Sequence, residues 1–145
     1  MSTAAAPAFK VRPGRRGDGE PIKGLLAELG FVGDSATVTW IVQHPEMELI
    51  VAVDNFEKVI GFVSLSHRPN LRHGGRIATI DELIVAKAWR RKTVGRELLK
   101  RALDRAKVLG VKRLEIQSLE SAGDDSVKFF AAQGLKPAGL HVYTL

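Results

Sequence analysis

The segment from Ala78 to Gly110 constrains the fold more than any other part of the chain. It reads ATIDELIVAKAWRRKTVGRELLKRALDRAKVLG, where an apolar stretch indicates a strand, a short basic loop follows, and an amphipathic pattern then indicates a long helix. The first N–H groups of a helix have no partner within it, so a helix start after a strand is a typical anion site. Asp81 and Glu82 lie in the predicted strand and offer a base near that site. The segment therefore suggests group transfer from a phosphorylated molecule.

Length and composition indicate a small globular protein. The chain has 145 residues, of which 45% are hydrophobic and 26% are charged, so we expect one domain over 1–145 with a loose tail over about 1–7. It has no cysteine, and its four histidines lack metal-ligand spacing, so we expect no metal site. Apolar runs fall well short of the roughly 20 residues of a membrane span, and we expect a cytoplasmic protein.

The net charge of +6 points to an anionic partner or to a solvated basic surface. One group of basic residues lies in the loop 67–76, which contains three arginines and two histidines. A second group lies around the predicted helix start, where an anion site is expected. This second group consists of Arg90, Arg91, Lys92, Arg96, Lys100 and Arg101.

Apolar periodicity and turn residues predict the order β-α-α-β-β-β-α-β-α-β. This order predicts an α/β (α+β) fold with a mixed, mostly antiparallel central sheet and helices on both faces, because adjacent strands come first and a strand–helix–strand crossover follows. The expected strands are 9–12, 48–53, 59–66, 77–85, 113–118 and 140–145, and the expected helices are 18–29, 34–43, 93–109 and 124–133.

Two motifs resemble those of the GNAT N-acetyltransferase superfamily. In that family a strand precedes the pattern Gln/Arg-x-x-Gly-x-Gly/Ala at a helix start, and this chain has Arg90-Arg91-Lys92-Thr93-Val94-Gly95, with Thr93 in place of the first glycine. Thr93 could also cap the helix. The stretch DDSVKFFAAQGL resembles a second signature that ends in Phe-Tyr-x-x-x-Gly-Phe, with Phe130 at the tyrosine position. The order of elements resembles the same fold.

The resemblance implies transfer of an acetyl group from acetyl-CoA to a primary amine of a small molecule or peptide, by direct attack in a ternary complex. Main-chain N–H groups of the loop would hold the pyrophosphate, and those of the preceding strand would contact the acetyl and pantetheine groups. The implied cofactor-binding residues are Leu83, Ile84, Val85, Arg90, Arg91, Lys92, Thr93, Val94, Gly95, Arg96 and Phe129.

The acceptor needs a base, because an alkylammonium resembles lysine, with a pKa of about 10.4. Asp81 and Glu82 are the candidates. Strict alternation along a strand would place them on opposite faces, with Glu82 on the face of Ile80 and Ile84. We favour Glu82 slightly, while pairing of either carboxylate with a nearby arginine is an equally strong interpretation.

The leaving thiolate lacks an evident proton donor. Phe130 stands where the resemblance implies a tyrosine, but a thiol with a pKa near 8.5 can leave unassisted. Tyr143 has no positive reason for this role, and Ser118, Ser121 or a water molecule could serve equally well.

Three further expectations concern partners. The basic loop 67–76 favours an acceptor that also carries an acidic group, over a polycation. A non-catalytic acyl-CoA-binding module of the same fold is the main alternative function, and a basic nucleic-acid-binding protein is a weaker one, since the aromatic residues lie in apolar periodic segments. A homodimer is compatible with the sequence.

Overall fold

The computed structural model describes residues 8–118 and 123–145, so the expected tail over 1–7 and the candidate Ser121 lie outside it. Two short 3-10 turns, Arg16–Asp18 and Lys87–Trp89, precede α1 and α3. The main elements are β1 (Phe9–Pro13), α1 (Gly19–Glu28), α2 (Ser35–Gln43), β2 (Met47–Asp54), β3 (Val59–Asn70), β4 (Gly75–Val85), α3 (Val94–Leu109), β5 (Arg113–Ile116) and α4 (Gly123–Ala132).

The five strands form one sheet in the order β1-β2-β3-β4-β5. The pairs from β1 to β4 are antiparallel, while β5 lies parallel to β4 after the crossover through α3. This arrangement confirms the predicted mixed, mostly antiparallel sheet.

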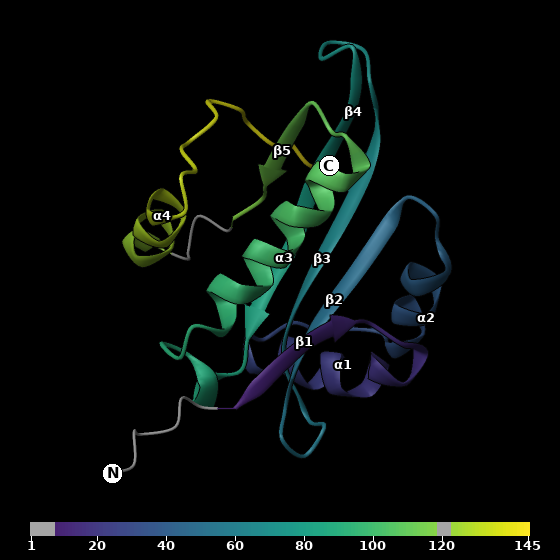
Figure 1. The fold of residues 1–145 in the computed structure, drawn as a ribbon, viewed down its shortest axis with the longest axis vertical. Coiled ribbons are helices and arrows are strands. Elements are labelled where there is room, and N and C mark those ends of the chain that lie inside the picture. Colours follow the sequence, from purple (N-terminus) through teal and green to yellow (C-terminus); the bar gives the residue numbers. More distant parts are fainter. Residues whose placement is uncertain (1–7, 119–122) are drawn as a thin grey trace.

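Helices cover both faces of the sheet. Helix α3 lies along one face, whereas α1 and α2 lie on the other (Figure 1). Gly61 of β3 lies under α3, where an added Cβ would be 3.0 Å from the main-chain oxygen of Ile84 and 3.1 Å from Leu98. The α3 face buries residues including Val63, Leu65, Ala78, Ile80, Leu98 and Ala102. The opposite face buries residues including Ile22, Leu25, Val51, Phe62 and Ile84.

Helix α2 begins at a capping residue and three helices end close to glycines, as the sequence predicts. Asp34 caps α2, since its carboxylate accepts a hydrogen bond from the N–H of Ala36 at 2.9 Å. Gly30, Gly110 and Gly134 follow helices with φ of 84°, 69° and 85°, the left-handed conformation that glycine adopts without a Cβ clash.

Two predicted elements differ in the structure. Residues 140–145 form no strand, and the apolar side chains of Leu140, Val142 and Leu145 are exposed. The alternation of apolar and polar residues in this segment favours a strand locally. A strand also needs a neighbouring strand that pairs with its backbone N–H and C=O groups. The predicted loop 67–76 is largely strand: β3 and β4 pair as far as Asn70 and Gly75, so the hairpin projects beyond the other strands (Figure 1).

Candidate functional site

A β-bulge in β4 places both candidate carboxylates on the same face of the sheet. Ser64 pairs with Glu82 and Leu65 pairs with Ile80, so Asp81 is an extra residue. Ile80 therefore packs under α3, whereas Ile84 packs under α1 and α2. The expectation that the two carboxylates take opposite faces was wrong, because it assumed regular alternation through the strand.

Two serines of β3 hold the carboxylates. The hydroxyl of Ser64 contacts the carboxylate of Glu82 and also accepts a hydrogen bond from the Glu82 N–H at 3.1 Å. The hydroxyl of Ser66 lies 3.2 Å from the carboxylate of Asp81. Ser64 and Ser66 alternate with Val63 and Leu65, so they lie on the face opposite α3.

Burial raises the pKa of both carboxyls above its ordinary value. For Asp81, the hydrogen bond from Ser66 and the positive charge of Arg68 offset part of this rise. For Glu82, the hydrogen bond from Ser64 offsets part of it, and the negative charge of Asp81 adds to it. The pKa of a general base is most useful when it approaches the working pH, and the surroundings of Glu82 shift it in that direction.

The main chain of β4 beyond the bulge presents outward N–H groups. The N–H of Ala86 donates to the Ile60 carbonyl at 2.8 Å, so Ile84 has the orientation that also pairs with β3. Leu83 and Val85, which alternate with Ile84, turn their main-chain groups away from β3. Pairing of β4 with β5 ends at Ile80 in the described part of the chain. Of the three residues predicted to contact the cofactor through their main chain, Leu83 and Val85 thus direct their N–H groups away from β3, whereas Ile84 directs its N–H group toward β3.

Four basic residues surround the start of α3. Arg90, Arg91, Lys92 and Arg96 are exposed, and none of them pairs with a carboxylate among residues 8–118 and 123–145. The same part of the chain supplies no side-chain acceptor for the first N–H groups of α3, those of Val94, Gly95 and Arg96. This turn therefore presents unpaired donors and positive charge together, as an anion site requires.

Thr93 is at the N-cap position of α3 but does not cap it. Its φ is 69°, in the left-handed region, and its side chain makes no capping hydrogen bond. The expected role as a cap was wrong, because this backbone conformation differs from the extended one that a capping threonine adopts. The left-handed conformation instead explains why a glycine would suit the position.

We expect Thr93→Gly to stabilise the protein by about 1 kcal/mol, because a Cβ in the left-handed region costs roughly that much. Thr93 is exposed, so trimming its side chain removes little packing. A matched control is Thr37→Gly in α2, which should instead destabilise by up to about 1 kcal/mol. Chemical unfolding measures both, and a lower free energy of unfolding for Thr93→Gly would contradict the prediction.

Side chains from β4, α3 and α4 meet beside this turn. A Cβ built on Gly95 would lie 3.6 Å from Val85 and 3.8 Å from the ring of Phe129. The rings of Phe129 and Phe130 pack edge to face at 5.5 Å. Tyr143 is 89% exposed in the C-terminal segment, 6.3 Å from the ring of His141. The sole tyrosine of the chain therefore does not pack into this cluster.

The arginines of the β3–β4 hairpin do not act as one group. Arg76 donates to His67 at 3.2 Å and pairs with Glu46 at 3.0 Å. His67 alternates with Leu65 and lies on the α3 face, opposite the carboxylates. Arg72 is exposed in the turn of the hairpin, whereas Arg68 shares the face of Ser64 and Ser66. Of the three arginines, Arg68 is thus the one placed to act beside Asp81.

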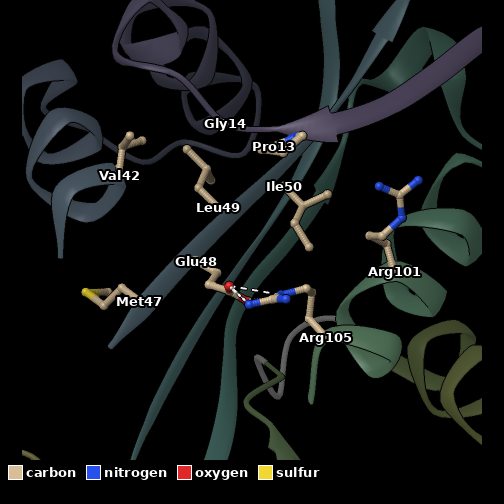
Figure 2. Close-up of a pocket in the computed structure, with 9 residues that line it drawn as sticks. All are labelled: Pro13, Gly14, Val42, Met47, Glu48, Leu49, Ile50, Arg101 and Arg105. Atoms are coloured by element: carbon tan, nitrogen blue, oxygen red, sulfur yellow. Dashed lines mark hydrogen bonds and ion pairs between the residues drawn. The ribbon is translucent and has the colours of Figure 1, made fainter. Parts of the chain in front are cut away.

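A hollow of about 240 Å³ lies elsewhere, where the end of β1 meets the first residues of β2 (Figure 2). Val42 and Leu49 line one side, while Arg101 and Arg105 reach in from α3, and Arg105 forms an ion pair with Glu48. Arg101 and Arg105 lie about 10 and 16 Å along α3 from Val94. The hollow is therefore separate from the start of α3.

The described residues include no group of three or more histidine, aspartate or glutamate side chains that could hold a metal ion. None of the helices in the same residues is long and apolar enough to cross a membrane.

Comparison with known families identifies the chain. The model of the acetyltransferase (GNAT) family matches residues 25–135, which is more than half of the sequence. The chain belongs to this family, and membership implies acyltransferase activity. A comparison with curated proteins gives no match.

Solved structures with the same fold include several acetyltransferases. A transcriptional regulator from Bacillus halodurans C-125 has a TM-score of 0.85 at 23% identity, over 95% of this chain and 99% of the other. Glucosamine-6-phosphate N-acetyltransferase from Arabidopsis thaliana has a TM-score of 0.80 at 18% identity, over 95% and 98%. Ribosomal-protein-alanine N-acetyltransferase from Brucella melitensis biovar Abortus 2308 has a TM-score of 0.76 at 20% identity, over 95% and 98%.

Proposed function

We propose that the protein transfers an acetyl group from acetyl-CoA to a primary amine. The observation that carries the proposal is the sequence of groups along β4 and into α3. Asp81 and Glu82 share one face, Leu83 and Val85 turn their N–H groups outward, and the strand then leads to the basic helix start. Base, oxyanion donors and anion site therefore follow one another within a short stretch of chain.

The start of α3 would bind the pyrophosphate of acetyl-CoA, the co-substrate of this family. The N–H groups of Val94, Gly95 and Arg96 supply donors, and the positive end of the helix dipole favours the anion. The surrounding side chains of Arg90, Arg91, Lys92 and Arg96 add positive charge. Gly95 has no side chain to obstruct the approach, and Phe129 and Val85 beside it offer apolar contact to the pantetheine arm.

Glu82 would accept a proton from the acceptor ammonium, directly or through water. The neutral amine then attacks the thioester carbon, so that a C–N bond forms and the carbonyl oxygen becomes an oxyanion. An outward N–H of Leu83 or Val85 would stabilise that oxyanion. The attacking nitrogen, now positively charged, loses its second proton to solvent, and collapse of the intermediate breaks the C–S bond and releases the CoA thiolate. Since Phe130 has no hydroxyl, the thiolate takes its proton from solvent or another donor.

The acceptor is proposed to be an amine that also bears an acidic group. Arg68 lies on the face of the two carboxylates, and its charge acts on Asp81. A guanidinium there can bind a carboxylate or phosphate of the acceptor while the amine approaches Glu82.

An acceptor panel of amino acids, dipeptides, polyamines and aminoglycosides tests this proposal by thiol release. We expect an acidic acceptor to be preferred, and Arg68→Ala to raise its KM about tenfold, the loss expected for a charged hydrogen bond. Arg72→Ala, at the tip of the hairpin, is the matched control and should leave the KM unchanged. Preference for polyamines, or equal effects of both substitutions, would contradict the acceptor assignment.

A non-catalytic acyl-CoA-binding module is the second candidate. The absence of a hydroxyl at Phe130 and of a glycine at Thr93 favours it. Calorimetric binding of acetyl-CoA without thiol release in the presence of any acceptor on the panel would support the module over the enzyme.

A further inference from the structure

We propose that Ser64 is a positioning residue that orients Glu82 for its role as base. The inference rests on the proposed function. Its geometric basis is that one hydroxyl of β3 contacts both the side chain and the main chain of Glu82.

The bulge creates the need for this contact. Asp81 is inserted opposite the Ser64–Leu65 peptide, so the regular ladder between β3 and β4 is broken at this point. The N–H of Glu82 donates to the Ser64 hydroxyl at 3.1 Å, so a side chain supplies the acceptor where the ladder is interrupted. The hydroxyl in turn donates its proton to the Glu82 carboxylate. A single serine thus fixes both ends of the glutamate residue.

The position of Ser64 makes the arrangement rigid. Ser64 is 3% exposed and lies in the middle of β3, flanked by the fully buried Val63 and Leu65. Its hydroxyl therefore cannot turn toward bulk water, and Glu82 is held on the face of the sheet away from α3. Orientation of a base within hydrogen-bond reach of its substrate is a requirement of proton transfer.

The hydroxyl also favours the ionised carboxylate. Among charged groups, Asp81 acts on Glu82, and Arg68 acts on Asp81. Burial and the charge of Asp81 raise the pKa of Glu82, and the hydrogen bond from Ser64 counteracts them. Without Ser64, a larger fraction of Glu82 would be protonated and unable to act as a base at neutral pH.

The chain contains a matched control. Two residues further along β3, the hydroxyl of Ser66 lies 3.2 Å from the carboxylate of Asp81 and makes no hydrogen bond to Glu82. Ser66→Ala removes an equivalent hydroxyl but leaves both contacts of Glu82 in place. Comparison of Ser64→Ala with Ser66→Ala therefore separates an effect on Glu82 from a general loss of polarity at the bulge.

The experiment is a pH profile of kcat/KM for wild type and both variants. We expect Ser64→Ala to move the acid limb to higher pH and to lower kcat/KM about tenfold on the acid side, the effect of losing a hydrogen bond to a charged group. The change should lie in kcat, with the affinity for acetyl-CoA unaltered. Ser66→Ala should move the limb much less. Equal profiles for wild type and Ser64→Ala, or the larger shift in Ser66→Ala, would overturn the proposal.

A second measurement does not depend on turnover. The carboxyl carbon of Glu82 can be titrated by NMR in protein with labelled glutamate, with Glu82→Gln to assign the signal. Its midpoint should rise in Ser64→Ala and change little in Ser66→Ala. An unchanged midpoint overturns the role of Ser64 whether or not the protein is an enzyme. A raised midpoint in a protein that acetylates no acceptor would refute the proposed function instead.

Discussion

Glu82→Gln is expected to lower kcat by about a hundredfold or more, the loss typical of a missing general base. The carboxylate would accept the proton of an ammonium with a pKa of about 10.4, so its replacement by an amide leaves the amine protonated. Asp81→Asn should lower kcat less, because Asp81 shares the face of Glu82 without being the base. Affinity for acetyl-CoA should remain unchanged in both, since the proposed phosphate site lies at the start of α3.

The pH profile of kcat/KM distinguishes the two carboxyls by the direction in which the acid limb moves. A base acts when ionised, so kcat/KM should rise with pH through the raised pKa of Glu82. Asp81→Asn removes a negative charge that raises this pKa, so the acid limb should move to lower pH. This shift is opposite in direction to the one expected for Ser64→Ala. Full rates for Glu82→Gln across the pH range would show that Glu82 is not the base.

Glu82→Gln is expected to remain folded, because the protonation of Glu82 is linked to the stability of the protein. The pKa of Glu82 is raised in the folded protein, so its favourable contribution to stability is lost as the pH rises through that pKa. Glutamine does not ionise, and its carbonyl can still accept the proton of the Ser64 hydroxyl. The free energy of unfolding of Glu82→Gln at neutral pH should therefore be at least that of wild type.

Elements with a strong local signal could be predicted from the sequence. The helix expected over 93–109 forms over Val94–Leu109, because its apolar stripe and terminal glycine are properties of the segment itself. The final strand expected over 140–145 does not form, because pairing depends on a free strand edge elsewhere in the fold. The periodicity of apolar residues indicates which face of a segment is buried, but it does not indicate whether a neighbouring strand is available for pairing.

The bulge is the feature of the site that alternation could not predict. One extra residue at Asp81 reverses the side-chain direction of the rest of β4, and nothing in the order of apolar residues marks it. A signal did exist in the partner strand: Ser64 and Ser66 are polar residues at alternate positions in an otherwise apolar segment. Such a polar row could have indicated polar partners in the neighbouring strand, on the face of the sheet away from α3, where the two carboxylates lie.

Arg90→Glu combined with Arg96→Glu is expected to weaken acetyl-CoA binding by about a hundredfold or more. Each reversal removes a charged donor, worth roughly 1.5–3 kcal/mol in a hydrogen bond to an anion, and adds repulsion. Both side chains are exposed at the start of α3, so the substitutions should leave the core intact. Calorimetry measures the affinity, which for wild type should also fall as ionic strength rises.

The matched control is Lys107→Glu combined with Lys112→Glu. This pair changes the net charge by the same amount, from +6 to +2, since each of the two reversals removes two charges. Lys107 is 13 residues from Val94 on α3, or about 20 Å along the helix, which exceeds the Debye length at physiological salt. The control should therefore retain nearly full affinity.

A ligand control separates phosphate recognition from thioester recognition. Acetyl-pantetheine carries the thioester without the phosphates, so the reversals at Arg90 and Arg96 should not affect its weaker binding or its use as an acetyl donor. If both double variants lose affinity equally, the attraction is a property of net charge alone. If neither loses affinity while remaining folded, the phosphates of acetyl-CoA do not bind at the start of α3.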